Sequence, residues 1–395
     1  MGIYASATTA EELFACNNPD TTIALERSFA LDRPLTLRAG VAIDGGGHTL
    51  SFPETDGVAL VRDNAVRDLR IECDAKARAV LFADDPEGTF LLERVTTKGQ
   101  IALINERGTH DVFVDAHDVC VEYADATARA AMPHGYNVDV EQGAFTLWNR
   151  AESTLYRAKA TGISVGTSLQ PVIGSGVFVS GDESAEFLMT DLQTSDVFAD
   201  SAIPSGVPSK VSGGVFVVHR AHVGTVSCTG VVQTWGNNAM ALDNWGSVDT
   251  WTATKDVSTF GPSSIGFVNF GRIGMLALLG DIVTRGLGSR GFNNYDGTVE
   301  RLLIGRIETF GDGAVGFQIS KPVGTVSIAR GITTHGGTGM SLVKGAMKEL
   351  QAHAFSIIEG GSAAQASIGG PIRVDDPETQ AVVGAEHVEG GLKTV

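Results

Sequence analysis

The sequence predicts an all-β protein: a single right-handed parallel β-helix, a solenoid with coils of ~25 residues. Three observations predict it: a repeat, columns of like residues one repeat apart, and 49 glycines in 395 residues. The clearest copies of the repeat begin at Gly266, Gly291 and Gly316. Each copy holds short runs of alternating apolar and β-branched residues, broken by Gly, Asn or Asp, as in short strands and turns.

Two columns of the repeat predict which side chains face the core. The β-branched column holds Val232, Val257, Ile282, Ile307 and Ile332, and the threonine column holds Thr234, Thr259, Thr284, Thr309 and Thr334. Because alternate residues of a strand share a face, both columns should point inward. The column between them, Gln233, Ser258, Val283, Glu308 and Thr333, should then point outward.

The elements before the clear repeats fit the same fold. Thr9 and Glu12 have the spacing of a capping box, which predicts a short helix over residues 9–16. Strand-like runs follow at residues 21–25, 35–50, 57–61, 66–73, 89–97 and 100–104. We therefore expect one domain over residues 1–395. Residues 123–143 and 196–214 interrupt the period and are predicted long loops, and residues 371–395 are a predicted C-terminal tail.

One stretch of this region resembles a known family. A capped helix, an apolar strand and then PLTLRAGVAIDGGGHTLSF (Pro34–Phe52) resemble the opening of right-handed parallel β-helix proteins of the pectin-lyase-like superfamily. The resemblance is one of architecture; it implies a helix that covers the open end of the core and carbohydrate-active chemistry. The set of polygalacturonase-type motifs is not present, so no residue role is carried over.

Composition limits the partners. The chain has 29 Lys and Arg against 46 Asp and Glu, a net charge of −17, which disfavours nucleic acid and repels anionic polymers. No apolar run is long enough to span a membrane, and the first residues do not form a signal peptide. This predicts a cytoplasmic protein, or a secreted one if a signal was removed. The four cysteines lack metal-ligand spacing, and neither a metal nor a cofactor is expected.

A polar cluster follows the first strand of each repeat, and together these clusters predict a binding face. Their amides, carboxylates and aromatic rings suit a polyhydroxylated ligand. The expected substrate-binding residues are Trp148, His219, His222, Asn244, Trp245, Asn269, Arg272, Asn294 and Tyr295. Turn chemistry is the alternative reading of the Asp and Asn residues, and packing on neighbouring coils is that of Trp148 and Tyr295.

The carboxylates on the same face predict that the protein is an enzyme. We expect a glycoside hydrolase or related transglycosylase acting on a neutral oligo- or polysaccharide. Asp243 would be base or nucleophile, and Asp182 or Glu183 the acid, with Asp296 as its rival. Carboxyls two coils apart would lie about 9.6 Å from each other, close to the spacing of inverting glycosidases.

Two other functions stay open. A polysaccharide lyase or epimerase would use a basic group, and Arg150, Arg220, Arg272 and Lys321 are available on the same face. A non-catalytic trimeric spike or glycan-binding protein would bind without turnover.

The residue after the threonine column predicts assembly. This outward column holds Trp235, Phe260, Arg285, Phe310 and His335. A strip with three large aromatic residues usually marks an interface, which predicts a homo-oligomer, most simply a trimer. The alternative is that residues 371–395 fold back over the strip.

Overall fold

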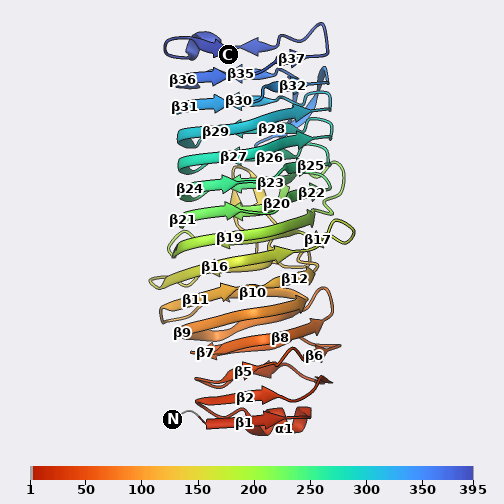
Figure 1. The fold of residues 1–395 in the computed structure, drawn as a ribbon, viewed down its shortest axis with the longest axis vertical. Coiled ribbons are helices and arrows are strands. Elements are labelled where there is room, and N and C mark those ends of the chain that lie inside the picture. The colour runs from red at the N-terminus through yellow and green to blue at the C-terminus, as the bar shows by residue number, and fades with distance from the viewer. Residues whose placement is uncertain (1–2, 395) are drawn as a thin grey trace.

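The computed structural model describes residues 3–394 as a stack of β-coils that climbs from the N-terminus to the C-terminus (Figure 1). Nearly all strand pairs are parallel and belong to one continuous sheet, and the coils wind in the right-handed sense usual for parallel strand connections. The predicted fold class is confirmed. Among residues 3–394, the only α-helix is short, and no helix could cross a bilayer.

Each coil contributes to three faces. The first face is formed by β4 (Leu35–Thr36), β7 (Val58–Arg62), β10 (Gln100–Asn105), β15 (Gly143–Asn149), β18 (Ser175–Ser180), β20 (Lys210–Val217), β23 (Ala239–Asn244), β26 (Ile265–Asn269), β28 (Arg290–Asn294), β30 (Phe317–Ile319), β35 (Phe355–Ile357) and β38 (Val382–Val383). The second face is formed by β1 (Ile3–Ala7), β2 (Thr21–Leu25), β5 (Ala42–Asp44), β11 (Val112–His117), β21 (Ala221–Cys228), β24 (Ser247–Ala253), β31 (Pro322–Ile328), β36 (Ser362–Ile368) and β39 (Leu392–Thr394).

The third face is formed by β3 (Phe29–Ala30), β6 (Thr49–Phe52), β12 (Cys120–Tyr123), β17 (Val172–Ile173), β22 (Val232–Trp235), β25 (Val257–Thr259), β32 (Ile332–Thr334) and β37 (Ile372–Val374). Longer strands bend from the second face into the third: β8 (Ala65–Cys73), β16 (Leu155–Val165), β19 (Glu186–Asp200), β27 (Arg272–Thr284) and β29 (Thr298–Thr309). The strand β9 (Arg78–Lys98) also pairs with the first face. Two hairpins extend from the coils: β13 (His134–Gly135) with β14 (Val138–Val140), of which β14 also pairs with β20, and β33 (Thr338–Val343) with β34 (Ala346–Gln351), which form a separate sheet. A 3-10 turn, η1 (Ala385–His387), lies near the C-terminus.

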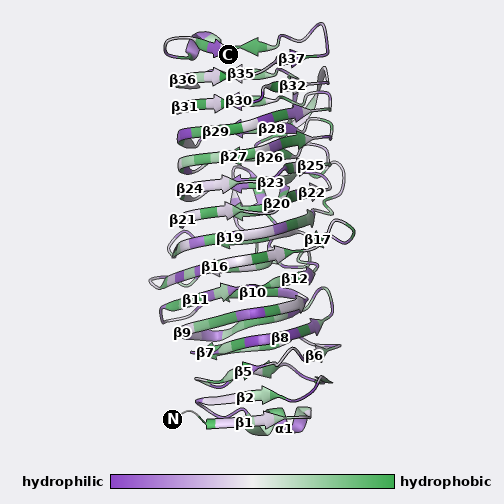
Figure 2. Cartoon of the chain, viewed as in Figure 1, coloured by the Kyte–Doolittle hydropathy of each residue, from purple (hydrophilic) through white to green (hydrophobic). Residues whose placement is uncertain are grey.

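The core columns lie as the repeat predicts. Val232, Val257 and Ile282 pair in register, as do the threonines two residues on, and both columns are fully or almost fully buried. On the first face, the rings of Phe267 and Phe292 stack with centroids 5.9 Å apart, and the stack continues upward through further phenylalanines. In Figure 2, apolar and polar residues alternate along many strands, as expected when one side of a strand faces the core.

The capping helix is confirmed. The helix α1 spans Ala10–Cys16, and the Thr9 side chain accepts a hydrogen bond from the Glu12 N–H at 3.2 Å. The Glu12 carboxylate accepts from Thr8 rather than from Thr9, at 2.7 Å. Leu13 is buried against the first coil. The strand β1, which precedes the helix and pairs with β2, was not predicted.

Three predicted segments need correction. Residues 123–143 are not a plain loop, because they hold the β13–β14 hairpin. Only residues 201–209 of the segment 196–214 lie outside strands, since β19 ends at Asp200 and β20 begins at Lys210. The tail 371–395 continues the solenoid: β37, β38 and β39 pair with β32, β35 and β36.

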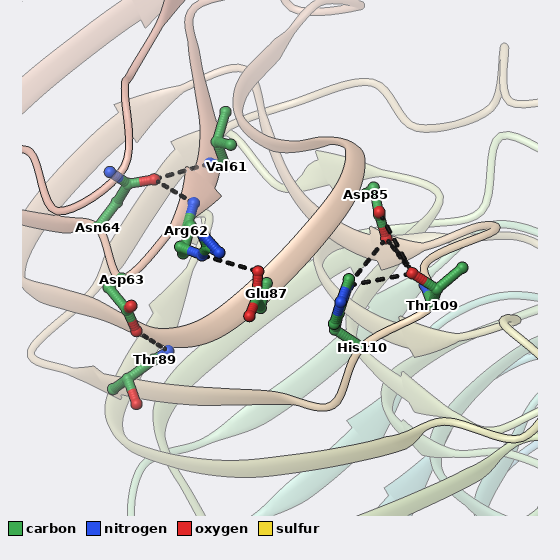
Figure 3. A network of polar contacts seen from close by, with 9 residues as sticks. All are labelled: Val61, Arg62, Asp63, Asn64, Asp85, Glu87, Thr89, Thr109 and His110. Carbon is green, nitrogen blue, oxygen red and sulfur yellow. Dashed lines mark hydrogen bonds and ion pairs between the residues drawn. The ribbon is translucent and has the colours of Figure 1, made fainter. Parts of the chain in front are cut away.

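The N-terminal coils are joined by polar contacts between turns (Figure 3). Asn64 Oδ1 accepts hydrogen bonds from the backbone of Val61 and Arg62, and the Arg62 side chain pairs with Glu87 at 2.7 Å. One coil further, the Asp85 carboxylate accepts from the backbone N–H of Thr109 at 2.8 Å. These contacts link turns of neighbouring coils.

Candidate functional site

Two β-hairpins stand on the outer side of the first face. In the β13–β14 hairpin, the turn residues Tyr136 and Asn137 have φ values of 51° and 66°. In the β33–β34 hairpin, Lys344 and Gly345 have φ values of 49° and 77°. Positive φ at both turn residues is typical of type I′ turns, whose twist matches that of paired strands. The second hairpin was not predicted; it lengthens the step from Phe317 to its register partner Phe355.

The two hairpin tips meet, although about 200 residues separate them in the sequence. The Asn137 side chain donates to the Lys344 carbonyl at 3.4 Å. Together the hairpins form a roof, and the outward side chains of the first face are buried beneath it. Phe178, Phe216 and Val268 belong to this second apolar cluster, which is separate from the core of the solenoid.

A groove of about 760 Å³ runs beside the β13–β14 hairpin. Hairpin residues 132–136 form one wall, and turns of successive coils form the rest, with Trp148, Arg150, Asp182, Glu183, His219 and Arg220. Trp148, Asp182, Glu183 and His219 were predicted site residues, and the structure brings these four together. His134 and Tyr136 were not singled out from the sequence.

The groove floor is held by a chain of contacts. The Trp148 indole N–H donates to the Gly181 carbonyl at 2.9 Å, and the Arg150 guanidinium lies over the Trp148 ring at 4.8 Å. Arg150 also pairs with Asp182 at 3.5 Å and with Glu106. Trp148 is therefore a buried part of the floor and offers no free ring for a ligand. Asp182 is half-buried and Glu183 is exposed.

His219 lies where the groove meets the roof. Burial lowers the pKa of His219, although the nearby carboxylates of Asp182 and Glu183 act in the opposite direction. Its ring is 4.8 Å from that of Trp245. A Cβ at position 135 would lie 2.4 Å from His219 Nε2, so glycine is needed in the hairpin at this close approach.

A cavity of about 30 Å³ lies under the roof. Its polar lining includes Asp243, Arg290 and Tyr295, and its aromatic lining includes Tyr136 and Phe270. The Arg290 side chain is fully buried; it donates to the Tyr295 hydroxyl and, at 2.7 Å, to the Leu342 carbonyl. A buried arginine was not predicted, since its column neighbour in β26 is apolar.

Asp243 does not lie on an open face. Burial raises its pKa well above the ordinary value, although the Trp245 indole and the Asn244 backbone N–H act in the opposite direction. Nor does Asp243 share a column with the other predicted carboxylates. Its register partners are Phe216 and Val268, and Asn293 stands two coils away. The predicted two-coil spacing of carboxyls from Asp182 through Asp243 to Asp296 is therefore wrong.

The three asparagines predicted to bind sugar are structural. Asn244, Asn269 and Asn294 are fully buried at successive coil corners. The Asn244 amide donates to the Asn269 side-chain oxygen, and the Asn269 amide to that of Asn294, both at 2.8 Å. Because their amides bond one another, these side chains stabilise the coil corners, as the alternative interpretation stated. They are not free to bind a sugar, so their predicted binding role is corrected.

The remaining predicted residues are scattered. His222 and Arg272 lie on the second face, where they pair with Asp249 at 3.8 Å and Glu300 at 3.1 Å. Asp296 pairs with Lys344 of the roof at 2.6 Å.

Two aromatic residues that were predicted to lie on the open binding face are covered by the roof. Trp245 and Tyr295 follow the coil strands β23 and β28 and are almost completely buried beneath the hairpins. They pack on other aromatic rings, which supports the packing alternative for Tyr295.

No family model, curated protein or solved structure matches the chain. Over residues 3–394, His, Cys, Asp and Glu form no group of three or more that could hold a metal ion.

A buried glutamate at the base of the roof predicts a pH effect. Glu141 follows β14, and burial raises its pKa to about 7 from 4.5, with Lys210 acting in the opposite direction. The folded state thus keeps a proton that the unfolded chain releases, so stability falls as pH rises from about 4.5 to 7. At pH 8, Glu141→Gln should raise the free energy of unfolding by about 3 kcal/mol.

Chemical denaturation at two pH values checks this. The gain should vanish at pH 4, where both chains are neutral at this position, and the exposed control Glu152→Gln should change little at either pH. An equal gain at pH 4 and pH 8 would contradict the assignment.

Proposed function

We propose that the groove binds an oligo- or polysaccharide and that the protein hydrolyses it, with Asp182 and Glu183 as the catalytic carboxyls. The observation that carries the proposal is one groove in which two carboxyls lie beside Arg150 and His219. Carboxylates, guanidinium groups and imidazoles all bond hydroxyl groups, and a groove of this size accepts several sugar units.

The balance of charge favours a neutral substrate. Arg150 and Arg220 offset Asp182 and Glu183 within the groove, and both arginines also pair with glutamates nearby. The chain as a whole carries a net charge of −17, which repels a polyanion. A neutral glycan meets neither a local nor a long-range electrostatic penalty.

The chemistry would be addition of water across a glycosidic C–O bond. Glu183 would be the carboxylic acid that donates a proton to the leaving oxygen as the bond from that oxygen to the anomeric carbon breaks. Asp182 would be the carboxylate that accepts a proton from water as the water oxygen bonds to the anomeric carbon. Arg150 orients Asp182 through their ion pair. Asp243 has no part in this step, because the roof covers it.

The architecture adds support of a weaker kind. Stacked parallel coils with a capping helix are also the architecture of the pectin-lyase-like superfamily. On that ground we propose that this chain is a member of the superfamily. Function depends on the site rather than the fold, so the groove carries the argument.

A lyase is the second candidate, and the two arginines of the groove favour it. Arg150 or Arg220 would bind the uronate carboxylate and neutralise its charge, which makes the C–H next to it more acidic. This reading requires an anionic substrate, against which the net charge argues.

A panel of neutral and acidic glycans with product analysis tests these candidates. Release of reducing ends without new ultraviolet absorbance supports hydrolysis, and absorbance of an unsaturated uronate supports the lyase. Binding without turnover indicates a glycan-binding protein, and no binding by any glycan would overturn the proposal.

The outward column that begins at Trp235 forms a row of stacked rings and bears on the predicted oligomer. Trp235 stacks on Phe260 with centroids 5.3 Å apart, Arg285 lies over Phe310, and Phe310 stacks on His335. Phe260 stays 37% exposed.

We propose that this row of rings, from Trp235 to His335, is the contact surface of a trimer. Light scattering should give three times the monomer mass, and Phe260→Asp with Phe310→Asp should give a monomer; a wild-type monomer at micromolar concentration would contradict the trimer.

A further inference from the structure

The cavity under the roof holds polar atoms that nothing in the described structure satisfies. Asp243 Oδ1, Trp245 Nε1 and Arg290 Nε are buried and have no hydrogen-bond partner among residues 3–394. The Trp245 indole lies near Asp243, but not in hydrogen-bond geometry. All three residues line the cavity. Burying such atoms unpaired costs about 1–3 kcal/mol each, so a partner is expected.

The unpaired atoms define the chemistry of that partner. Two are N–H donors, and the third is a carboxyl oxygen. A hydroxyl group can accept from one and donate to the other, whereas a purely apolar ligand satisfies neither. The surrounding rings of Phe270, Tyr295 and Tyr136 offer flat apolar faces of the kind on which sugar rings stack.

Tyr136 fills the place that such a ring would take. Its ring stacks on Phe270 with centroids 4.0 Å apart and meets Trp245 edge-on at 5.1 Å. Tyr136 also lines the groove, so it separates the groove from the cavity. At about 30 Å³, the cavity has room for about two water molecules but not for a sugar.

The segment that carries Tyr136 can move without breaking the solenoid. The strand β13 pairs with β14 alone, whereas β14 also pairs with β20 of the solenoid; the β33–β34 hairpin forms a sheet of its own. The tips are joined by the 3.4 Å bond from Asn137 to Lys344, while Lys344 is tied to Asp296. Moving the Tyr136–Asn137 turn would break the ring contacts of Tyr136 and the bond from Asn137 to Lys344, but no strand pair of the solenoid.

We propose that the cavity is a subsite for one hydroxylated ring, and that displacement of the Tyr136–Asn137 turn enlarges it and joins it to the groove. This inference rests on the proposed glycan binding for the identity of the ligand, but not for the existence of the gate. With the turn displaced, the ring replaces Tyr136 against Phe270. Its hydroxyls then bond Asp243, Trp245 and Arg290.

Carboxyl labelling tests the gate. A water-soluble carbodiimide with an amine couples to accessible carboxyls, and peptide mass spectrometry gives the rate at Asp243. The variant Asn137→Cys with Gly345→Cys can lock the tips, because a Cβ on Gly345 would lie 3.0 Å from that of Asn137. The positive φ of Gly345, 77°, and the Asn137 carbonyl oxygen, 2.8 Å from that Cβ, strain the substitution, so the oxidised and reduced forms of the same variant are compared.

Oxidation of this variant should slow labelling of Asp243 at least tenfold, and reduction should restore the wild-type rate. Glu141 is the control, because it is buried in the segment 123–143 that carries the β13–β14 hairpin but does not line the cavity. Its labelling should change little. Equal Asp243 rates in the oxidised and reduced protein would overturn the gate.

Protection tests the ligand. Glucose, galactose, mannose and xylose at 100 mM are the probes. At least one should slow Asp243 labelling several-fold in the reduced protein and leave Glu141 unchanged. Absence of protection by all four would overturn the subsite. Protection in a protein that hydrolyses no glycan would instead refute the proposed function and leave the subsite standing.

Discussion

The Gly336→Ala variant should lose about 3 kcal/mol of its free energy of unfolding. A Cβ at this position would lie 2.0 Å from the carbonyl oxygen of Gly311 on the preceding coil, which is backbone and cannot swing aside. The same close approach recurs from coil to coil, with Gly261 at 1.5 Å from the Gly236 oxygen. A methyl group therefore has to push two coils apart.

The neighbouring residue supplies a matched control. A Cβ on Gly337 would meet only the end of the Asp376 side chain, at 3.1 Å, and that side chain can move. Gly337→Ala should cost well under half as much in chemical denaturation. Equal losses in the two variants would show that glycine flexibility, rather than coil contact, determines the effect.

Asp182→Asn should reduce turnover by about 10²–10⁴-fold on any glycan that the protein cleaves. The amide cannot take the proton from water, while its size and its place beside Arg150 are kept. Glu183→Gln should cause a similar loss, because it removes the proton donor. Reducing-end release under substrate saturation measures both effects.

Two controls make this result specific. Asp191→Asn changes a half-exposed carboxylate on β19, outside the groove, and should leave turnover unchanged. Glycan affinity of Asp182→Asn should change far less than its turnover. Full activity in a folded Asp182→Asn protein would remove Asp182 from the mechanism.

The solenoid could be predicted because its columns repeat in the sequence. Val232, Val257 and Ile282 stand 25 residues apart and pair as that spacing requires. The groove turns were predictable for a related reason: a polar cluster follows each first strand. Asp182 and Glu183 lie in such a turn.

The roof could not be predicted, because it depends on contacts outside the repeat. Asp243 follows an apolar strand and looks like a turn carboxylate, yet it lies inside β23 and is covered by segments about 100 residues away on either side. The hydrogen-bonded row of Asn244, Asn269 and Asn294 could not be predicted for the same reason. Asn244 and Asn269 repeat at the coil period, but only the structure shows that their amides face each other.

The most direct test of the glycan groove is a crystal structure of Asp182→Asn with an oligosaccharide that the protein binds. The sugar should lie between hairpin residues 132–136 and the turn of Asp182 and Glu183, within hydrogen-bond distance of Arg150 and His219. A sugar bound on the second or third face, with the groove empty, would contradict the account.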